Sequence, residues 1–321
     1  MKQKRISFFL CAALLFSLTA CGSSGSGENV RQPVAAPEES QPVQNQNQDQ
    51  DGQAPETPEE TRTPAPETAS EQKPVTISET VLLNQDGITI TAKELVVDDI
   101  WGPGIKLLVE NHSERNVSVS ADSLSVNSYM MYCDLFSASV AAGKKVNETL
   151  WLSESDLREA GIETIADVMV SFRAYDSDSY DDLFTTDEIQ IKTSAYGTVE
   201  QPAMDNGLEL FRQDGIRVVA LFLNSDGIFG ADVCLYLENC SGREITVDCD
   251  DMSVNGFMVT PYFRCKLKDG RRALDEITIL SADLEKNEIE SVKDIELKFH
   301  VVDSNTYKTI LDTETIRFSV E

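Results

Sequence analysis

Residues that could perform catalysis near neutral pH are scarce in this chain. Catalysis usually needs a group that titrates near neutrality or a bound metal. The 321 residues include only two histidines, His112 and His300, and neither has a histidine or cysteine neighbour at the spacing of a zinc site. No phosphate-binding glycine loop and no Gly-x-Ser-x-Gly turn occurs in the sequence. These residues predict a protein that is not an enzyme.

Acidic side chains are densest in the segment 176–182. Its carboxylates belong to Asp176, Asp178, Asp181 and Asp182. Alternating carboxylates in a loop could supply the oxygen ligands that Ca²⁺ prefers, although this loop lacks the glycine and the terminal glutamate of the helix–loop–helix calcium motif. A calcium site and a solvated turn therefore both remain open, and calcium is the one candidate cofactor.

The cysteines are unevenly distributed, and most of them lie in the last third of the chain. That group comprises Cys234, Cys240, Cys249 and Cys265. Four cysteines allow three pairings, and a disulfide would suit an exported domain. Buried thiols are the alternative, since free cysteine often behaves as a small apolar core residue.

Two aromatic residues occupy matching positions in glycine-containing segments. Trp101 follows Ile100, and Phe229 follows Ile228, with a glycine directly after each aromatic residue. An exposed aromatic ring could stack on a sugar or a peptide. The alternative is that each ring covers the core of its own domain.

Cys21 has a different setting from the other cysteines. The chain begins with Lys2, Lys4 and Arg5, continues with an apolar run over 6–18, and reaches Leu-Thr-Ala-Cys at 18–21. This pattern is typical of a secretory signal and resembles a bacterial lipobox. The resemblance implies that residues 1–20 form a signal peptide that is removed and that Cys21 carries an acyl chain such as palmitate. An uncleaved membrane helix and plain secretion with cleavage elsewhere are the alternatives, although the run is shorter than the roughly 20 residues of an ordinary span.

Residues 21–76 have the composition of a disordered linker. The segment is rich in Gly and Ser, then in Gln and Asn, then in Pro, Glu and Thr, and it holds few large apolar residues. Such a composition cannot bury enough surface to offset the entropy of ordering. We therefore predict a flexible tether that spans roughly 40 Å on average.

The remaining sequence contains an internal duplication. Residues 85–88 (Gln-Asp-Gly-Ile) recur at 213–216, and 125–127 (Ser-Val-Asn) recur at 253–255, both at an offset of 128. Later matches, such as Phe172 with Phe299, keep an offset of 127. A period this long indicates tandem domains. We call residues 77–197 the first copy and residues 205–321 the second copy.

Apolar and polar residues alternate with a period of two within each copy. The alternation runs through 88–92, 105–109 and 168–172, and through 233–237 and 295–299 in the second copy. This period predicts strands with one buried face, and about seven short strands per copy indicate an immunoglobulin-like sandwich. One short helix interrupts each copy: Ser153 would cap the first and Gly161 would end it, and Ser281 would be the counterpart cap. We expect each helix to cross from one sheet to the other, so the predicted fold class is all-β.

Several segments together resemble a known group of proteins. They are Val-Glu-Asn at 109–111, Ser-Val-Asn at 125–127, and the stretches 140–145 and 161–167. The pattern resembles immunoglobulin-like repeat modules of uncharacterised lipoproteins from Gram-positive, clostridia-like bacteria. The second copy departs from it at 268–272. The resemblance implies a fold and an envelope location, and it implies no activity.

The charge of the chain restricts its partners. The formal net charge is −28, so nucleic acid and anionic lipid surfaces would repel the folded body. We therefore predict a non-catalytic, lipid-anchored protein on the outer face of the cytoplasmic membrane, extending into the cell wall or beyond. Its two modules would bind a surface protein or glycan, and the membrane partner is the lipid anchor. A structural envelope lipoprotein without a ligand and a calcium-stabilised adhesin are the alternatives.

Overall fold

The computed structural model describes residues 31–35, 74–133 and 136–320. The predicted signal peptide, Cys21 and most of the predicted linker lie outside these residues. The described chain consists of β-strands and two short helices, so the predicted all-β fold is confirmed. Within this part of the chain, no helix has the length and apolar character that a membrane span requires.

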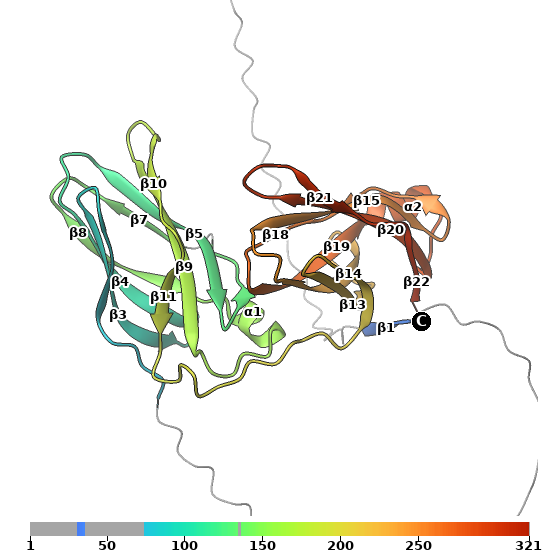
Figure 1. Cartoon of the computed structure of the whole chain (residues 1–321), viewed down its shortest axis with the longest axis horizontal. Coiled ribbons are helices and arrows are strands. Elements are labelled where there is room, and N and C mark those ends of the chain that lie inside the picture. Colours follow the sequence, from blue (N-terminus) through green and yellow to red (C-terminus); the bar gives the residue numbers. More distant parts are fainter. Residues whose placement is uncertain (1–30, 36–73, 134–135, 321) are drawn as a thin grey trace, which may run out of the picture.

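The first copy pairs its strands into two antiparallel sheets (Figure 1). The first sheet is formed by β2 (Thr80–Gln85), β3 (Ile88–Asp98), β4 (Gly102–Asn111) and β8 (Lys145–Trp151). The second is built on β5 (Val117–Val126) and β9 (Asp167–Asp176), with β6 (Tyr129–Met130), β7 (Ser137–Val140), β10 (Asp182–Thr185) and β11 (Ile189–Lys192).

The second copy repeats this pairing. Its first sheet is formed by β12 (Leu208–Gln213), β13 (Ile216–Asn224), β14 (Gly230–Asn239) and β19 (Arg271–Leu280), with β17 (Pro261–Tyr262). Its second sheet is built on β15 (Ile245–Val254) and β20 (Asp294–Asp303), with β16 (Phe257–Met258), β18 (Arg264–Leu267), β21 (Thr309–Asp312) and β22 (Ile316–Val320).

The alternation seen in the sequence corresponds to burial between facing sheets. Ile88, Ile90 and Ala92 of β3 are buried, and Ile295, Leu297 and Phe299 are buried on β20. Because side chains in a strand alternate between its faces, these residues line one face of each sheet. The buried apolar residues form two clusters, one mainly in each copy.

Each helix connects the two sheets of its copy. For α1 (Glu154–Glu159), the predicted cap is confirmed: Ser153 Oγ accepts a hydrogen bond from the Asp156 amide at 3.3 Å. Gly161 follows the helix with φ +62°, as the sequence predicted. For α2 (Ser281–Lys286), the predicted cap is wrong, because Leu280 occupies the N-cap and makes no capping side-chain bond. The Ser281 hydroxyl instead donates to the Phe229 carbonyl oxygen at 3.1 Å.

A strand forms inside the segment that we predicted to be a disordered linker. Residues Arg31–Ala35 form β1, so the prediction of disorder is wrong for these five positions. Arg31 lies opposite Asn224 of β13, and Val34 lies opposite Val320 of β22, so β1 joins the edges of both sheets of the second copy. Figure 1 shows β1 beside the C-terminal end of the chain.

The duplication explains why this edge accepts a strand. In the first copy, Thr193 pairs with Ile77, which leads into the domain. Val320 corresponds to Thr193, and Asp205 corresponds to Ile77. Asp205, however, forms an ion pair with Arg217 and does not reach Val320 as a strand partner. In the second copy, the segment that precedes β12 therefore leaves the edge at Val320 unpaired, and β1 pairs with that edge.

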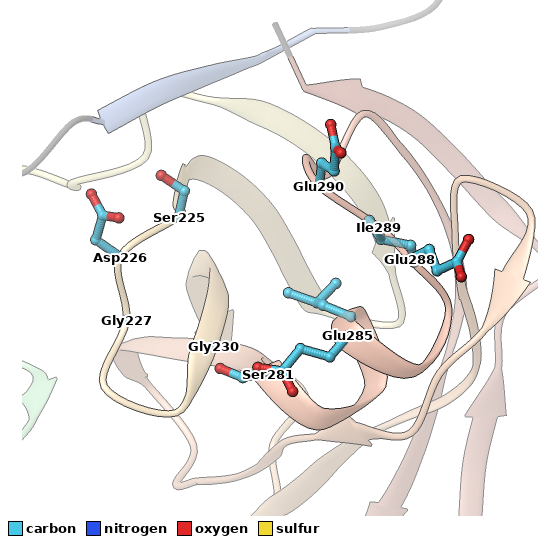
Figure 2. Close-up of a pocket in the computed structure, with 10 residues that line it drawn as sticks. Ser225, Asp226, Gly227, Gly230, Ser281, Glu285, Glu288, Ile289 and Glu290 are labelled. Carbon is cyan, nitrogen blue, oxygen red and sulfur yellow. The ribbon is translucent and has the colours of Figure 1, made fainter.

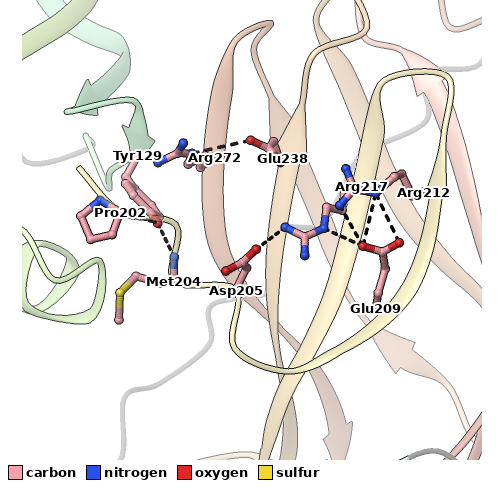
Figure 3. A network of polar contacts seen from close by, with 9 residues as sticks. All are labelled: Tyr129, Pro202, Met204, Asp205, Glu209, Arg212, Arg217, Glu238 and Arg272. Carbon is pink, nitrogen blue, oxygen red and sulfur yellow. Dashed lines mark hydrogen bonds and ion pairs between the residues drawn. The ribbon is translucent and has the colours of Figure 1, made fainter. Parts of the chain in front are cut away.

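The two copies contact one another through a polar and aromatic network (Figure 3). The Tyr129 hydroxyl donates to the Pro202 carbonyl oxygen at 3.0 Å and accepts from the Met204 amide at 2.8 Å. The Arg272 guanidinium lies 5.7 Å from the centre of the Tyr129 ring, and β6 pairs with β19 at this point. These bonds join the end of the first copy to one sheet of the second.

Candidate functional site

The loop between β3 and β4 holds Trp101 at one end of the first copy. Asp98 Oδ1 accepts hydrogen bonds from the Ile100 amide at 2.8 Å and the Trp101 amide at 3.0 Å. These two bonds favour the ionised carboxylate and lower the pKa of Asp98. Gly102 then takes φ +74°, a conformation that suits glycine, where the chain enters β4. The loop backbone is therefore held in one conformation.

Trp101 projects from this loop into solvent. Its side chain is 57 % exposed, and Ile100 beside it is also exposed. Trp151 supports one side of the Trp101 ring, because the two rings stack with centroids 6.3 Å apart and planes inclined by 23°. The structure thus places Trp101 as a supported and accessible ring, and it does not enclose the ring in the core of its own domain.

The loop between β13 and β14 carries the matching pair in the second copy. Phe229 is 69 % exposed and Ile228 is more exposed still. The Phe229 carbonyl oxygen accepts from the Ser281 amide at 2.8 Å, which ties the loop to the start of α2. Both copies therefore expose an isoleucine followed by an aromatic residue, at positions separated by 128 residues.

An acidic groove lies beside the second loop (Figure 2). It has a volume of about 800 Å³ and opens between the β13–β14 loop and the residues of α2 and its C-terminal end. Its carboxylates come from Asp226, Glu285, Glu288 and Glu290. Ser225, at the rim, directly follows the residue that pairs with β1, and Figure 2 shows the β1 ribbon near that rim. The sequence did not predict this groove, because Asp226 is far along the chain from Glu285, Glu288 and Glu290.

The acidic segment 176–182 forms a tight turn in which several carboxylates already have partners. Asp176 Oδ1 accepts from the Asp178 and Ser179 amides at 2.9 and 3.1 Å, which lowers the pKa of Asp176. Asp182 pairs with Arg173, and Asp181 accepts from the Ser179 hydroxyl. In the part of the chain that the structure describes, no group of three or more His, Cys, Asp or Glu residues is placed to hold a metal ion. The calcium site stays a prediction.

The cysteines of the second copy lie in two environments. Cys249 and Cys265 are buried in the core, whereas Cys240 is exposed. Burial raises the pKa of Cys249 to about 12 and raises that of Cys265 well above its ordinary value. Among residues 74–133 and 136–320, no disulfide joins any of the cysteines, including Cys234. The two core cysteines therefore pack as buried thiols, which was the alternative to a disulfide.

Comparisons with known proteins identify no family. No protein-family model matches the chain, and no curated protein matches it. Solved structures with some likeness include the exo-chitosanase CsxA of Amycolatopsis orientalis, which is 14% identical with a TM-score of 0.22 over 64% of this chain and 25% of that one. This chain thus spans about a quarter of the length of that protein.

Two further likenesses are equally distant. The Salmonella enterica SafA pilin in complex with the SafB chaperone is 12% identical, with a TM-score of 0.20 over 67% of this chain and 88% of that one. A protein of unknown function from Porphyromonas gingivalis W83 is 10% identical, with a TM-score of 0.19 over 77% of this chain and 98% of that one. At these values none of the likenesses indicates a function.

Proposed function

We propose that this protein is a non-catalytic, lipid-anchored module that binds a surface protein or glycan outside the cytoplasmic membrane. The observation that carries the proposal is the repeated exposure of an Ile–aromatic pair, Ile100–Trp101 and Ile228–Phe229, on loops tied down by hydrogen bonds. Contiguous exposed apolar surface can mark an interaction site, and each pair places two such side chains next to one another. Aromatic rings also suit both peptide and sugar ligands.

The contact between the copies supports binding at two points. The network around Tyr129 and Arg272 joins the copies, so both loops are carried by connected domains. Two linked sites can raise the apparent affinity by about 10²–10⁴ over either site alone when both are engaged. The sequence around Cys21 is the basis for proposing that the modules are displayed from a lipid anchor on the outer membrane face.

Crosslinking on intact cells, followed by identification of captured partners, tests the binding proposal. The test variant is Trp101→Ala with Phe229→Ala, which we expect to lose most of the partner captured by the unmodified protein. The matched control is Tyr180→Ser with Tyr307→Ser, because these two exposed aromatic residues also occupy equivalent positions but lie in other loops. The control should capture as much partner as the unmodified protein.

Two results would contradict the proposal. Equal capture by the loop variant and the control variant would show that the aromatic loops do not bind. If even the unmodified protein enriches nothing over a tagged anchor alone, the structural envelope role without a ligand is the better account.

A further inference from the structure

The contact between the copies is made by a hairpin that the second copy also possesses. In the first copy, the hairpin of β5 and β6 ends at residues 127–130, and its tip packs on the second copy. Tyr129 at this tip is only 1% exposed. Its ring meets Tyr236 edge to face, with centroids 6.4 Å apart, beneath the Arg272 guanidinium. The receiving surface is the outer face of the sheet formed by β12, β13, β14 and β19.

The corresponding hairpin of the second copy has the same backbone construction. Asn127 and Asn255 both adopt positive φ, at +47° and +50°. Asn127 Oδ1 accepts from the Ala166 and Asp167 amides, and Asn255 Oδ1 accepts from the equivalent amides at 293 and 294. The two tips are therefore the same structural unit, fastened to the domain in the same way.

The two tips differ in whether they are covered. Phe257 and Met258 occupy the positions of Tyr129 and Met130, yet they are 48% and 66% exposed. The second copy thus presents to solvent the apolar hairpin tip that the first copy buries. Because the equivalent tip at Tyr129 and Met130 packs on a sheet face, we expect the Phe257–Met258 tip to pack on a sheet face of the same kind.

The first copy carries a related but more polar face, because Val219, Leu221 and Leu274 of the receiving face correspond to Thr91, Lys93 and Asn147. Its β4–β8 sheet repeats the ion pair that flanks the receiving site: Lys145 and Glu110 lie 3.8 Å apart, where Arg272 and Glu238 lie 3.7 Å apart. Leu108 stands at the position that corresponds to Tyr236. The Lys145 side chain is 67% exposed and Leu108 is partly exposed, so a partner can reach both residues.

We infer that chains associate head to tail, with the Phe257–Met258 tip of one chain on the Leu108 face of a second copy of the chain. The Phe257 ring would lie under Lys145, as Tyr129 lies under Arg272, and this adds a cation–π contact to apolar burial. The contact joins two different surfaces, so it can extend into a row of molecules or close into a ring. Phe257 lacks the hydroxyl that bonds the 202–204 segment, so this contact is weaker than the one within the chain.

Sedimentation of the full chain carrying Cys21→Ser, over micromolar to millimolar concentrations, tests this contact without the anchor. We expect the mean mass to rise with concentration. Phe257→Asp places a charge on the apolar tip, and Leu108→Asp places a charge on the receiving face. Each variant alone should therefore stay monomeric. Lys145→Glu is a second variant of the receiving face that leaves the core untouched, and Tyr307→Asp is the control that should associate normally.

A mixture of the two kinds of variant gives the decisive result. Phe257→Asp retains an intact receiving face, and Lys145→Glu retains an intact tip, so together they should form a complex of one chain of each and nothing larger. If the Cys21→Ser chain without further substitutions stays monomeric at every concentration, the inference is overturned. Self-association of the single variants, or a mixture that remains monomeric, would overturn it as well.

Discussion

Two buried asparagines show how single residues hold each copy together. Asn111 Nδ2 donates to the carbonyl oxygens of Arg115 and Val140 at 2.8 and 2.9 Å, and Asn239 Nδ2 makes the equivalent pair of bonds. Asn111 Oδ1 also accepts from the amide and the hydroxyl of Ser113. One side chain therefore bonds the backbone groups of the turn that follows β4, which accounts for the recurrence of Asn111 as Asn239 in the second copy.

Replacing Asn111 should be costly for stability. Asn111→Ala leaves buried backbone oxygens without partners, so we expect it to lower the free energy of unfolding by about 2–3 kcal/mol. Urea denaturation measures the change. The control is Glu114→Ala at an exposed position nearby, which should cost less than about 0.5 kcal/mol. Equal effects of both changes would contradict the structural role of Asn111.

Asp205 gives the start of the second copy a dependence on pH. The hydrogen bond from Arg217 lowers the pKa of Asp205 below its ordinary value. A carboxylate with a lowered folded-state pKa stabilises the fold at pH values above its unfolded pKa, and this contribution is lost as the pH falls through the folded pKa.

Asp205→Asn should therefore weaken the protein at pH 7, and this effect should become smaller as the pH falls below the unfolded pKa of Asp205. We expect the melting temperature to fall by a few degrees at pH 7, since about 1 kcal/mol corresponds to roughly 2–4 °C for a chain of this size. Calorimetric scans between pH 7 and pH 3 measure this. A difference between the two proteins that does not shrink on acidification would show that the ion pair is not the cause.

At the level of elements, the positions of the strands could be predicted from the sequence, whereas contacts between elements that are remote in sequence could not. Alternation at 88–92 and 168–172 predicted β3 and β9, because burial on one face of a sheet imposes a period of two. Ser153 and Gly161 predicted α1 for a similarly local reason. The cap of α2 was missed because Ser281 bonds to Phe229, a residue that is remote in sequence.

Features of the candidate site were predictable only where they depend on local sequence. The offset of 128 marked Trp101 and Phe229 as equivalent, but their exposure depends on how whole loops are held. The acidic groove brings Asp226 close to residues of α2, and no local sequence pattern predicts that these residues lie together. β1 was not predicted because its composition is that of a linker. Its pairing depends on the unpaired edges of β13 and β22, which are remote in sequence.

The strand β1 should protect the sheet edges that it covers. Val34→Pro removes a backbone amide and restricts the backbone, so it should release β1 from β13 and β22. Hydrogen exchange of the full chain should then show faster exchange of the amides in 222–224 and 319–320 that face β1. Ala54→Pro, at another position of the predicted linker, is the control and should leave this exchange unchanged. Identical exchange in all three proteins would contradict the pairing.

At the level of the whole molecule, we propose that a lipid anchor on Cys21 determines where the two copies are held. Cys21→Ser should release the protein into the medium, because acyl chains attach a protein only through their own buried methylenes. The control is Cys11→Ser, which changes a cysteine inside the predicted signal peptide and should leave the protein with the membrane. Immunoblots of membrane and medium fractions measure the distribution. Full retention of the Cys21→Ser protein in the membrane would contradict the lipid anchor.

The pairing of β1 also gives the molecule a way to respond to mechanical load. If the chain is held near residue 21 and pulled through the first copy, the hydrogen bonds that pair β1 with β13 and β22 share the load. Once β1 separates from the second copy, residues 36–73 carry this load alone, and 38 fully extended residues span at most about 130 Å. The pairing of β1 therefore determines which part of the chain bears the load.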